Sequence, residues 1–191
     1  MTGVIIWLNG AFGAGKTSTA AELLPRVHGS RLFDPETVGF MLRPNLSDLP
    51  VSDFQHWEPW RNLVIATAAE LTRYTGEHLI APQTVLDEPY LRQIRAGLGA
   101  AGQPMFHVLL DASDDVLRRR IEGSDEARQW RLDHLAAYRA ARDWLTTDAD
   151  LVVDTTTLPP SATAEKIGRG PGDHRSVRAR RMPCLARRVR R

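Results

Sequence analysis

Eight consecutive residues near the start of the chain have the types and spacing of a phosphate-binding loop. They are Gly10-Ala11-Phe12-Gly13-Ala14-Gly15-Lys16-Thr17, which fit the pattern G-x-x-x-x-G-K-[ST] at every constrained position. Glycines let the backbone bend so that successive N–H groups converge on a phosphate, and the Lys16 ammonium adds a full positive charge there. The Thr17 hydroxyl is a ligand of the kind that Mg²⁺ prefers. This P-loop motif, with Ser18 directly after it, predicts a site for ATP and Mg²⁺.

The sequence on either side of the motif argues against a chance match. Residues 4–9 (VIIWLN) form the short apolar, β-branched run that is typical of a buried parallel strand. Residues 17–24 are rich in helix-forming alanine and leucine and end before Pro25. A strand, a glycine-rich loop and a helix in this order place the positive end of the helix dipole at the phosphate.

A second group of candidate residues is basic and follows the fourth expected strand. The segment 110–121 (LDASDDVLRRRI) resembles the strand-to-lid segment of adenylate kinase and its small-molecule kinase relatives. The resemblance implies that Arg120 packs on the adenine ring. Those relatives usually carry a further arginine where this chain has Ser124, so we expect Arg128 and Arg131 to clamp the γ-phosphate from a lid at about residues 123–131. The alternative is that both arginines only form solvated helix pairs with Asp125, Glu126 and Asp133.

Phosphoryl transfer to a hydroxyl also needs a group that accepts or orients the proton. Asp34 is the candidate, because it ends the second expected strand beside the P-loop and precedes Pro35, which favours extended backbone before it. An equally ordinary role for Asp34 is to cap a helix that begins near Pro35.

An acceptor molecule would need apolar and polar contacts, and the sequence offers candidates for both. Aromatic rings can stack on a base or cover a lipid chain, and polar side chains can bind sugar or diphosphate-like groups. The candidates are Phe40, Phe54, Trp57 and Trp60 for apolar contact, and Arg43, Arg61 and Gln83 for polar contact. The alternative for each aromatic residue is the ordinary core. No acid follows the third strand, which leaves open whether Asp34 or Asp111 reaches the metal.

Alternating strands and helices must position these residues. We expect strands at 4–9, 31–33, 78–81, 106–110 and 151–153, and helices at 17–24, 60–74, 90–101, 114–122 and about 132–145. Helices of this length between strands predict an α/β protein whose parallel sheet is covered on both faces. Ligands of such sheets bind at the carboxyl ends of the strands.

Length and charge divide the chain into two parts. A single domain is expected at 1–165, since 191 residues with 42% hydrophobic residues suit one core. This part has 15 basic and 22 acidic residues, whereas 166–191 has 10 basic and one acidic residue. We therefore expect a basic, disordered tail that accounts for the high pI, so the pI does not indicate a nucleic-acid-binding surface on the fold. The alternative is a weak contact of this tail with a membrane surface.

Cysteine usage and hydropathy bear on the compartment. Cys184 is the single cysteine, so no intramolecular disulfide or cysteine-based zinc site is expected. No apolar run approaches the roughly 18 residues that span a bilayer. These features predict a cytoplasmic protein without a transmembrane segment, and they leave the oligomeric state open.

Several segments together resemble one family, the tunicamycin resistance proteins of the P-loop kinase superfamily. The resemblance covers more than three-quarters of the chain and is carried by IIWLNGAFGAGKTSTA (5–20), RLFDPETVGFMLRP (31–44), DFQHWEPWR (53–61), HLIAPQTV (78–85) and DEARQWRLDHLAAYRAARDWL (125–145). It implies a three-layer P-loop kinase fold with a five-stranded parallel sheet of order 2-3-1-4-5 and a helical lid. It also implies ATP-dependent phosphorylation of a sugar hydroxyl of tunicamycin, a nucleoside antibiotic. The related chloramphenicol phosphotransferases use an aspartate after the second strand as base, which by analogy favours Asp34.

Two other functions are compatible with the same residues. One is a kinase for a cellular metabolite such as a nucleoside, a sugar or a shikimate-like compound. The other is a nucleotide-dependent protein that sequesters the antibiotic without modifying it. Detection of a phosphorylated product separates these possibilities.

Overall fold

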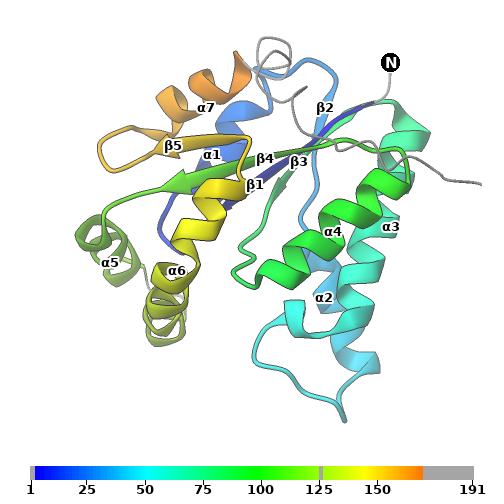
Figure 1. Ribbon diagram of the computed structural model, residues 1–191, viewed down its shortest axis with the longest axis horizontal. Coiled ribbons are helices and arrows are strands. Elements are labelled where there is room, and N and C mark those ends of the chain that lie inside the picture. The colour runs from blue at the N-terminus through cyan, green and yellow to red at the C-terminus, as the bar shows by residue number, and fades with distance from the viewer. Residues whose placement is uncertain (1–2, 125–126, 170–191) are drawn as a thin grey trace, which may run out of the picture.

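Five parallel strands form the centre of the protein (Figure 1), as a computed structural model that describes residues 3–124 and 127–169 shows. The sheet has the order β2-β3-β1-β4-β5, which confirms the predicted fold class. Its strands are β1 (Ile5–Gly10), β2 (Ser30–Leu32), β3 (His78–Pro82), β4 (Met105–Asp111) and β5 (Leu151–Asp154). All six residues of β1 are buried, because this strand lies between β3 and β4 and helices cover both faces.

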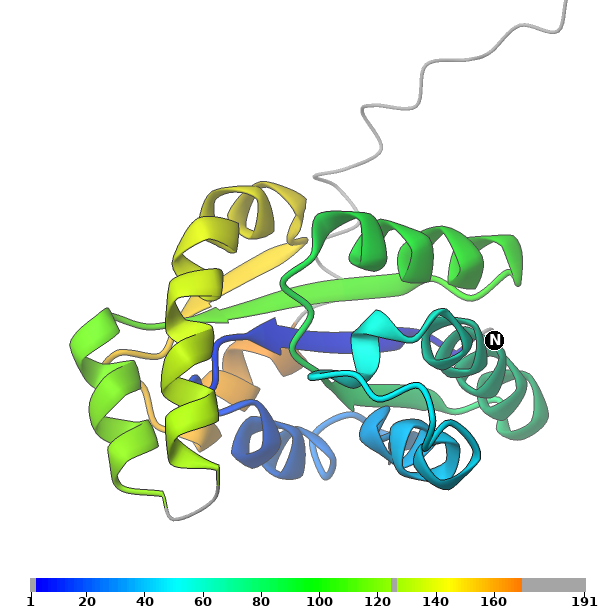
Figure 2. The same ribbon diagram turned by 90° about the horizontal axis from the view of Figure 1, so that it is seen from below.

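Helices pack on both faces of the sheet, as Figure 2 shows from below. On one face α1 (Lys16–Leu23) packs against α7 (Pro160–Gly168). On the other face α3 (Glu58–Thr75) packs against α4 (Glu88–Ala100), and α6 (Arg128–Asp148) contacts α4 and β4. Helix α5 (Asp114–Glu122) packs along α6, and in Figure 1 this pair lies on the opposite side of the molecule from α2 (Glu36–Leu42).

Three helical segments differ from the sequence-based expectation. Helix α6 was expected at about 132–145, but it begins at Arg128 and runs to Asp148, so that residues 128–131 of the expected lid form its first turn. Helix α7 was not expected, and α2 was considered only in the alternative in which Asp34 caps a helix that begins near Pro35. Helix α7 continues to Gly168, past residue 165 where the domain was expected to end. The expected tail lies outside the described residues from 170 onward, as do Asp125 and Glu126.

Two short 3-10 helices, η1 (Arg43–Asn45) and η2 (Phe54–His56), connect α2 to α3. The Phe54 ring lies directly on Gly39 of α2, where any added Cβ would meet ring atoms at 2.2 Å. Glycine at position 39 therefore lets α2 approach η2 closely, although glycine lowers the intrinsic helix propensity of this segment.

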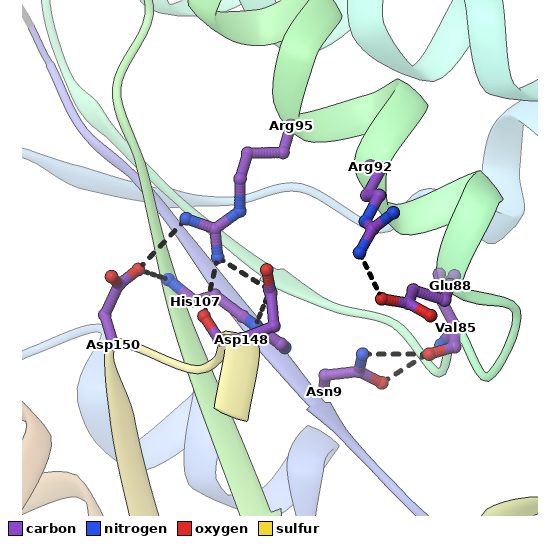
Figure 3. A network of polar contacts seen from close by, with 8 residues as sticks. All are labelled: Asn9, Val85, Glu88, Arg92, Arg95, His107, Asp148 and Asp150. Atoms are coloured by element: carbon purple, nitrogen blue, oxygen red, sulfur yellow. Dashed lines mark hydrogen bonds and ion pairs between the residues drawn. The ribbon is translucent and has the colours of Figure 1, made fainter. Parts of the chain in front are cut away.

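A polar network joins α4, β4 and the end of α6 on the far side of the sheet from α1 (Figure 3). The fully buried His107 of β4 has its Nδ1 atom 2.9 Å from Oδ2 of Asp148, and its backbone N–H donates to Asp150. Arg95 of α4 donates to both aspartates. The network therefore fixes the C-terminal end of α6 relative to the sheet, and α6 carries arginines expected at the site.

None of the helices in the described ranges has both the length and the apolar character that a membrane crossing requires.

Candidate active site

A cavity of about 740 Å³ opens at the carboxyl ends of β1, β2 and β3. The P-loop and the start of α1 form its floor, and β2, α2 and the residues after β3 form one side. The segment after β5 and two arginines of α5 and α6 form the other side. The residues that line the cavity include Phe12, Lys16, Thr17, Asp34, Glu36 and Gln83, with Arg120, Arg131 and Thr155.

Glycines are required at two kinds of position in the P-loop. Gly10 has φ +142°, and a Cβ there would lie 2.3 Å from the carbonyl oxygen of Leu110 in the adjacent strand. Gly13 and Gly15 have φ +81° and +92°, in the left-handed region that other residues rarely adopt. The loop can therefore turn from β1 into α1 within six residues, which directs the N-terminus of α1 into the cavity.

Lys16 lies inside the loop in an environment that disfavours its charge. Its Nζ atom donates to the carbonyl oxygens of Gly10 and Ala11 at 3.1 and 2.9 Å. Burial lowers the pKa of Lys16 from 10.5 to about 7; the carboxylate of Glu36 opposes this shift, and the positive charge of Arg131 adds to it. A polyphosphate beside Lys16 would supply the negative charge that this site lacks.

Asn9 fixes the P-loop to the segment that follows β3 (Figure 3). Its buried side chain donates to the carbonyl oxygen of Val85 at 3.0 Å and accepts from the N–H groups of Val85 and Gly10. Thr84 adds a hydrogen bond from its hydroxyl to the carbonyl oxygen of Gly10. Gln83, one residue earlier, is thereby held at the cavity wall; it is the one predicted acceptor contact that lines the cavity. Neither Asn9 nor Thr84 was identified from the sequence as a positioning residue.

Arg120 joins α5 to the P-loop. Its guanidinium donates to the carbonyl oxygen of Gly13 at 3.2 Å and to that of Thr155 at 2.8 Å. Thr155, which follows β5, in turn donates from its hydroxyl to the carbonyl oxygens of Ala14 and Asp111. These bonds hold Arg120 at the edge of the cavity beside the P-loop, and its expected contact with the adenine ring stays a prediction.

The two arginines expected to clamp phosphate lie in different places. Arg131 lines the cavity, donates to the Ser124 hydroxyl at 3.0 Å and has its Cζ atom 5.9 Å from the centre of the Phe12 ring. Arg128 does not line the cavity; its Nε atom is 3.4 Å from the Ser124 carbonyl oxygen on the exposed side of α6. The structure thus brings Arg131, but not Arg128, to the P-loop.

Two carboxylates face the P-loop across the cavity, and the sequence had indicated only one of them. Asp34 is exposed and lines the cavity, and its Oδ1 atom accepts at 2.9 Å from the N–H of Glu36, the first residue of α2. Burial raises the pKa of Glu36, the charges of Asp34 and Asp53 raise it further, and Lys16 and Arg131 act in the opposite direction. The sequence could have indicated Glu36 as well, because it follows Asp34 by two residues and both residues flank the same turn.

Most of the residues expected to bind the acceptor lie outside the cavity. Trp60 is fully buried and donates from its indole N–H to the carbonyl oxygen of Pro35. Arg61 is 8% exposed, donates to Gln93 and to the carbonyl oxygen of Gln55, and lies 4.0 Å from the centre of the Tyr90 ring. These two residues pack α3 against its neighbours. Trp60 therefore has the core role that was the alternative to contact with the acceptor.

The remaining acceptor candidates form a separate aromatic cluster on α2, η1 and η2. The Phe54 ring stacks on Trp57 at 5.8 Å and meets Phe40 edge-on at 5.3 Å. The Arg43 guanidinium lies 4.9 Å from the centre of the Phe54 ring. Phe40 is 52% exposed, and none of the four residues lines the cavity.

Oxygen ligands suitable for Mg²⁺ are present in the cavity. The Thr17 hydroxyl and the carboxylates of Asp34 and Glu36 line it, and oxygen is the donor that Mg²⁺ prefers. Asp111 is engaged elsewhere: it accepts from the hydroxyl of Tyr138 at 2.6 Å and from Arg142 at 2.6 Å, which binds β4 to α6. Within the described ranges, no three or more histidine, cysteine, aspartate or glutamate side chains form a group that could hold a metal by themselves. The residues present fit a magnesium ion that takes its other ligands from phosphate and water.

Comparison with known sequences identifies a matching family and a curated relative. A family model described as an AAA domain (AAA_33) matches residues 5–145. A nucleotide-binding protein from Nocardioides sp. (strain ATCC BAA-499 / JS614) is 27% identical over 183 residues, which are 92% of this chain and 53% of that protein. The chain thus spans about half the length of this curated relative.

Comparison with solved structures identifies similar folds. The tunicamycin resistance protein of Deinococcus radiodurans is 29% identical, with a TM-score of 0.68 over 85% of this chain and 92% of that chain. A sugar kinase from Janibacter sp. HTCC2649 is 19% identical, with a TM-score of 0.63 over 86% and 91% of the two chains. The APS kinase of Mycobacterium tuberculosis is 18% identical, with a TM-score of 0.58 over 87% and 95%. At these identities the two kinases show a shared fold alone.

Proposed function

The chain belongs to the AAA domain family AAA_33 and has a P-loop kinase-like fold, and from this premise we propose that it transfers the γ-phosphoryl group of ATP to a hydroxyl group of a small molecule. One observation carries the proposal: a single cavity contains the P-loop lysine, the Thr17 hydroxyl, a carboxylate at the end of β2 and an arginine of α6. Phosphoryl transfer requires these four kinds of group, because its catalysis is mainly positioning and charge stabilisation.

The acceptor that we propose is tunicamycin, phosphorylated on a sugar hydroxyl. The similarity to the Deinococcus radiodurans tunicamycin resistance protein extends over 85% of this chain and supports this choice. The charge of the cavity supports it as well. Asp34 and Glu36 make the side of the cavity around α2 negative, which disfavours an acceptor bearing a carboxylate or phosphate and suits an uncharged one. Gln83, which lines the cavity, would contact this acceptor.

The P-loop would bind the triphosphate. Its backbone N–H groups and the N-terminus of α1 surround the β-phosphate, and Lys16 contacts the β- and γ-phosphates. Arg131 approaches the γ-phosphate from the opposite side, where it stabilises the negative charge that develops during transfer. Arg120 presents the face of its guanidinium to the adenine ring. When bound, Mg²⁺ supplies charge neutralisation of the triphosphate, with the Thr17 hydroxyl as one ligand.

Asp34 is the proposed base. It accepts the proton of the acceptor hydroxyl as the hydroxyl oxygen forms a bond to the γ-phosphorus, and the bond from that phosphorus to the β–γ bridging oxygen breaks, which releases ADP. The N–H of Glu36 holds one oxygen of Asp34 and thereby orients the carboxylate. The carboxylate of Glu36 lowers the affinity of this region for a second anion.

Mass spectrometry of tunicamycin after incubation with the protein and Mg²⁺–ATP tests the proposal. The parent protein should add one phosphoryl group. The variant Asp34→Asn should bind ATP as the parent does but lower kcat by about 100-fold or more, because it retains the shape of Asp34 without its basicity. Phosphorylation of another metabolite and not of tunicamycin would identify a different acceptor. Tight binding of tunicamycin without any product, with Asp34→Asn as protective in cells as the parent, would instead indicate sequestration.

A further inference from the structure

The side chain of Phe12 has no role in the P-loop pattern, since that position contributes only its backbone to phosphate binding. In this structure, however, the ring extends from the loop toward α6 and is contacted by three α6 residues. The Trp130 ring meets it edge-on at 4.9 Å, and the His134 ring at 5.6 Å. Arg131, between them in sequence, has its guanidinium 5.9 Å from the centre of the same ring.

The same ring also contacts the P-loop lysine. The Nζ atom of Lys16 is 5.3 Å from the ring centre. Phe12 therefore lies within cation–π distance of both cations that face the γ-phosphate, one from the loop and one from α6. Burial is the main cause of the lowered pKa of Lys16, and the positive charge of Arg131 lowers it further, so the two cations repel each other. An attractive contact shared by both cations offsets this repulsion. The negative face of an aromatic ring provides an attraction of this kind.

Contacts on α6 fix the position of Phe12 in turn. Trp130 and His134 are one turn apart on the helix, with ring centres 4.0 Å apart, and Nδ1 of His134 lies 2.6 Å from the carbonyl oxygen of Trp130. This pair forms a surface against which the Phe12 ring rests. Arg131 is further held by the hydroxyl of Ser124.

We propose that Phe12 is a positioning residue that holds Arg131 opposite Lys16, so that the binding site for the γ-phosphate is formed before the nucleotide arrives. This inference rests on the proposed function only in taking Lys16 and Arg131 as the groups that bind the γ-phosphate. Phe12 does not touch the reacting atoms; it acts through Arg131. Preorganised cations lower the cost of ordering side chains when the ligand binds.

Calorimetric titration with two nucleotides tests the inference. Mg²⁺–AMP-PNP presents a γ-phosphate to both cations, whereas Mg²⁺–ADP does not. For Phe12→Leu, which keeps an apolar side chain but removes the ring, the Kd of AMP-PNP should rise about tenfold and the Kd of ADP should change less than about twofold. Arg131→Met should give the same selective loss. Adding Phe12→Leu to Arg131→Met should then have little further effect, because the two residues act as a unit.

Two controls separate positioning from general stability. Phe12→Tyr retains a ring and should retain the parental ratio of the two Kd values. Phe106→Leu makes the same substitution in β4 outside the cavity and should leave both Kd values unchanged. Equal weakening of both nucleotides by Phe12→Leu, no change in either, or additive effects in the double variant would overturn the inference. Since no acceptor is involved, the tunicamycin assay can fail without affecting this result, and this inference can fail while tunicamycin is still phosphorylated.

Discussion

Lys16 is the residue whose environment most clearly favours an anionic ligand. Its ammonium is held by two backbone carbonyl oxygens, near a like charge from Arg131, and burial lowers its pKa to about 7. An ordinary lysine has a pKa of 10.5, so folding without a ligand places a cation where it is poorly solvated. The carboxylate of Glu36 offsets only part of this cost, since the pKa of Lys16 stays lowered. A triphosphate would remove this cost, which links nucleotide binding to the protonation of one residue.

Replacing Lys16 by methionine should therefore stabilise the nucleotide-free protein while it abolishes ATP binding. The folded pKa of Lys16 is below the unfolded value, so between about pH 7 and 10 the unfolded chain binds more protons and the stability of the parent rises with pH. We expect Lys16→Met to raise the unfolding free energy by about 1 kcal/mol at pH 7, and less toward pH 10.

Urea denaturation at pH 7 and 9.5 measures this difference. Lys166→Met on the exposed part of α7 is a matched control, and we expect no comparable effect from it. An unchanged or lower stability of Lys16→Met at pH 7, with ATP binding intact, would contradict the role of Lys16.

The connection between β1 and the segment after β3 depends on one amide side chain. The Nδ2 and Oδ1 atoms of the Asn9 side chain form hydrogen bonds with the backbone of Val85, and Oδ1 also accepts from the N–H of Gly10. The segment after β3 has no regular secondary structure to satisfy its backbone, so a side chain supplies the hydrogen bonds. The same contact sets the position of Gln83 and Thr84 relative to the P-loop.

We expect Asn9→Ala to destabilise the protein by about 2 kcal/mol, since it leaves buried N–H and C=O groups without partners. Nucleotide affinity should fall as well, because the positions of Gly10 and Thr84 relative to each other are then less fixed. Asn45→Ala in η1 removes an exposed hydrogen bond to the carbonyl oxygen of Met41 in α2 and should cost less than about 0.5 kcal/mol. Urea denaturation compares the two variants, and equal stabilities of the two would exclude the proposed role for Asn9.

The overall arrangement depends on how α6 is attached at its two ends. Its first turns carry Trp130, Arg131 and His134 to the P-loop, and its last residue, Asp148, joins the network with His107 and Arg95 (Figure 3). Between these ends Tyr138 and Arg142 bind Asp111 of β4. A helix fixed to the sheet at its end and middle can present its first turns to the cavity in one position.

Breaking the network at Asp148 should destabilise the whole domain. Burial alone would raise the pKa of Asp148, but the hydrogen bond with His107 and the charge of Arg95 hold it below its ordinary value. The carboxylate therefore contributes stability at pH values above its unfolded pKa, and this contribution is lost as the pH falls. We expect Asp148→Asn to lower the unfolding free energy by about 2 kcal/mol at pH 7.

A pH series of denaturation curves is the measurement. The difference between parent and Asp148→Asn should shrink as the pH falls from about 5 toward 2, where the parent loses its charge too. A difference that stays constant over this range would show that the charge of Asp148 is not the stabilising feature. Arg95 and His107 both contact Asp148, and Asp150 shares these two partners. The same series with Asp143→Asn, on the exposed side of α6, provides the baseline.

Local sequence determined the parts of this protein that depend on neighbouring residues. The P-loop is specified by glycines that adopt left-handed backbone conformations, and the buried strands by short apolar runs. The alternation of strands with helices then predicted a parallel sheet with Lys16, Thr17 and Asp34 at one edge, and the resemblance to P-loop kinases implied the strand order. Helix α5 was predicted with its observed bounds, since acids begin it and glycine follows it.

Tertiary packing decided what no local pattern could. Helix α2 has only seven residues and includes Gly39, so its formation depends on the Phe54 ring that packs on it. Arg128 and Arg131 lie in the same first turn of α6, and the docking of this helix on the sheet and the P-loop places only Arg131 at the cavity. Trp60 and Arg61 are residue types that an acceptor site could use, but both pack α3 against its neighbours instead. Which side chain reaches the cavity depends on the rotation and docking of whole helices, and those are set by long-range contacts.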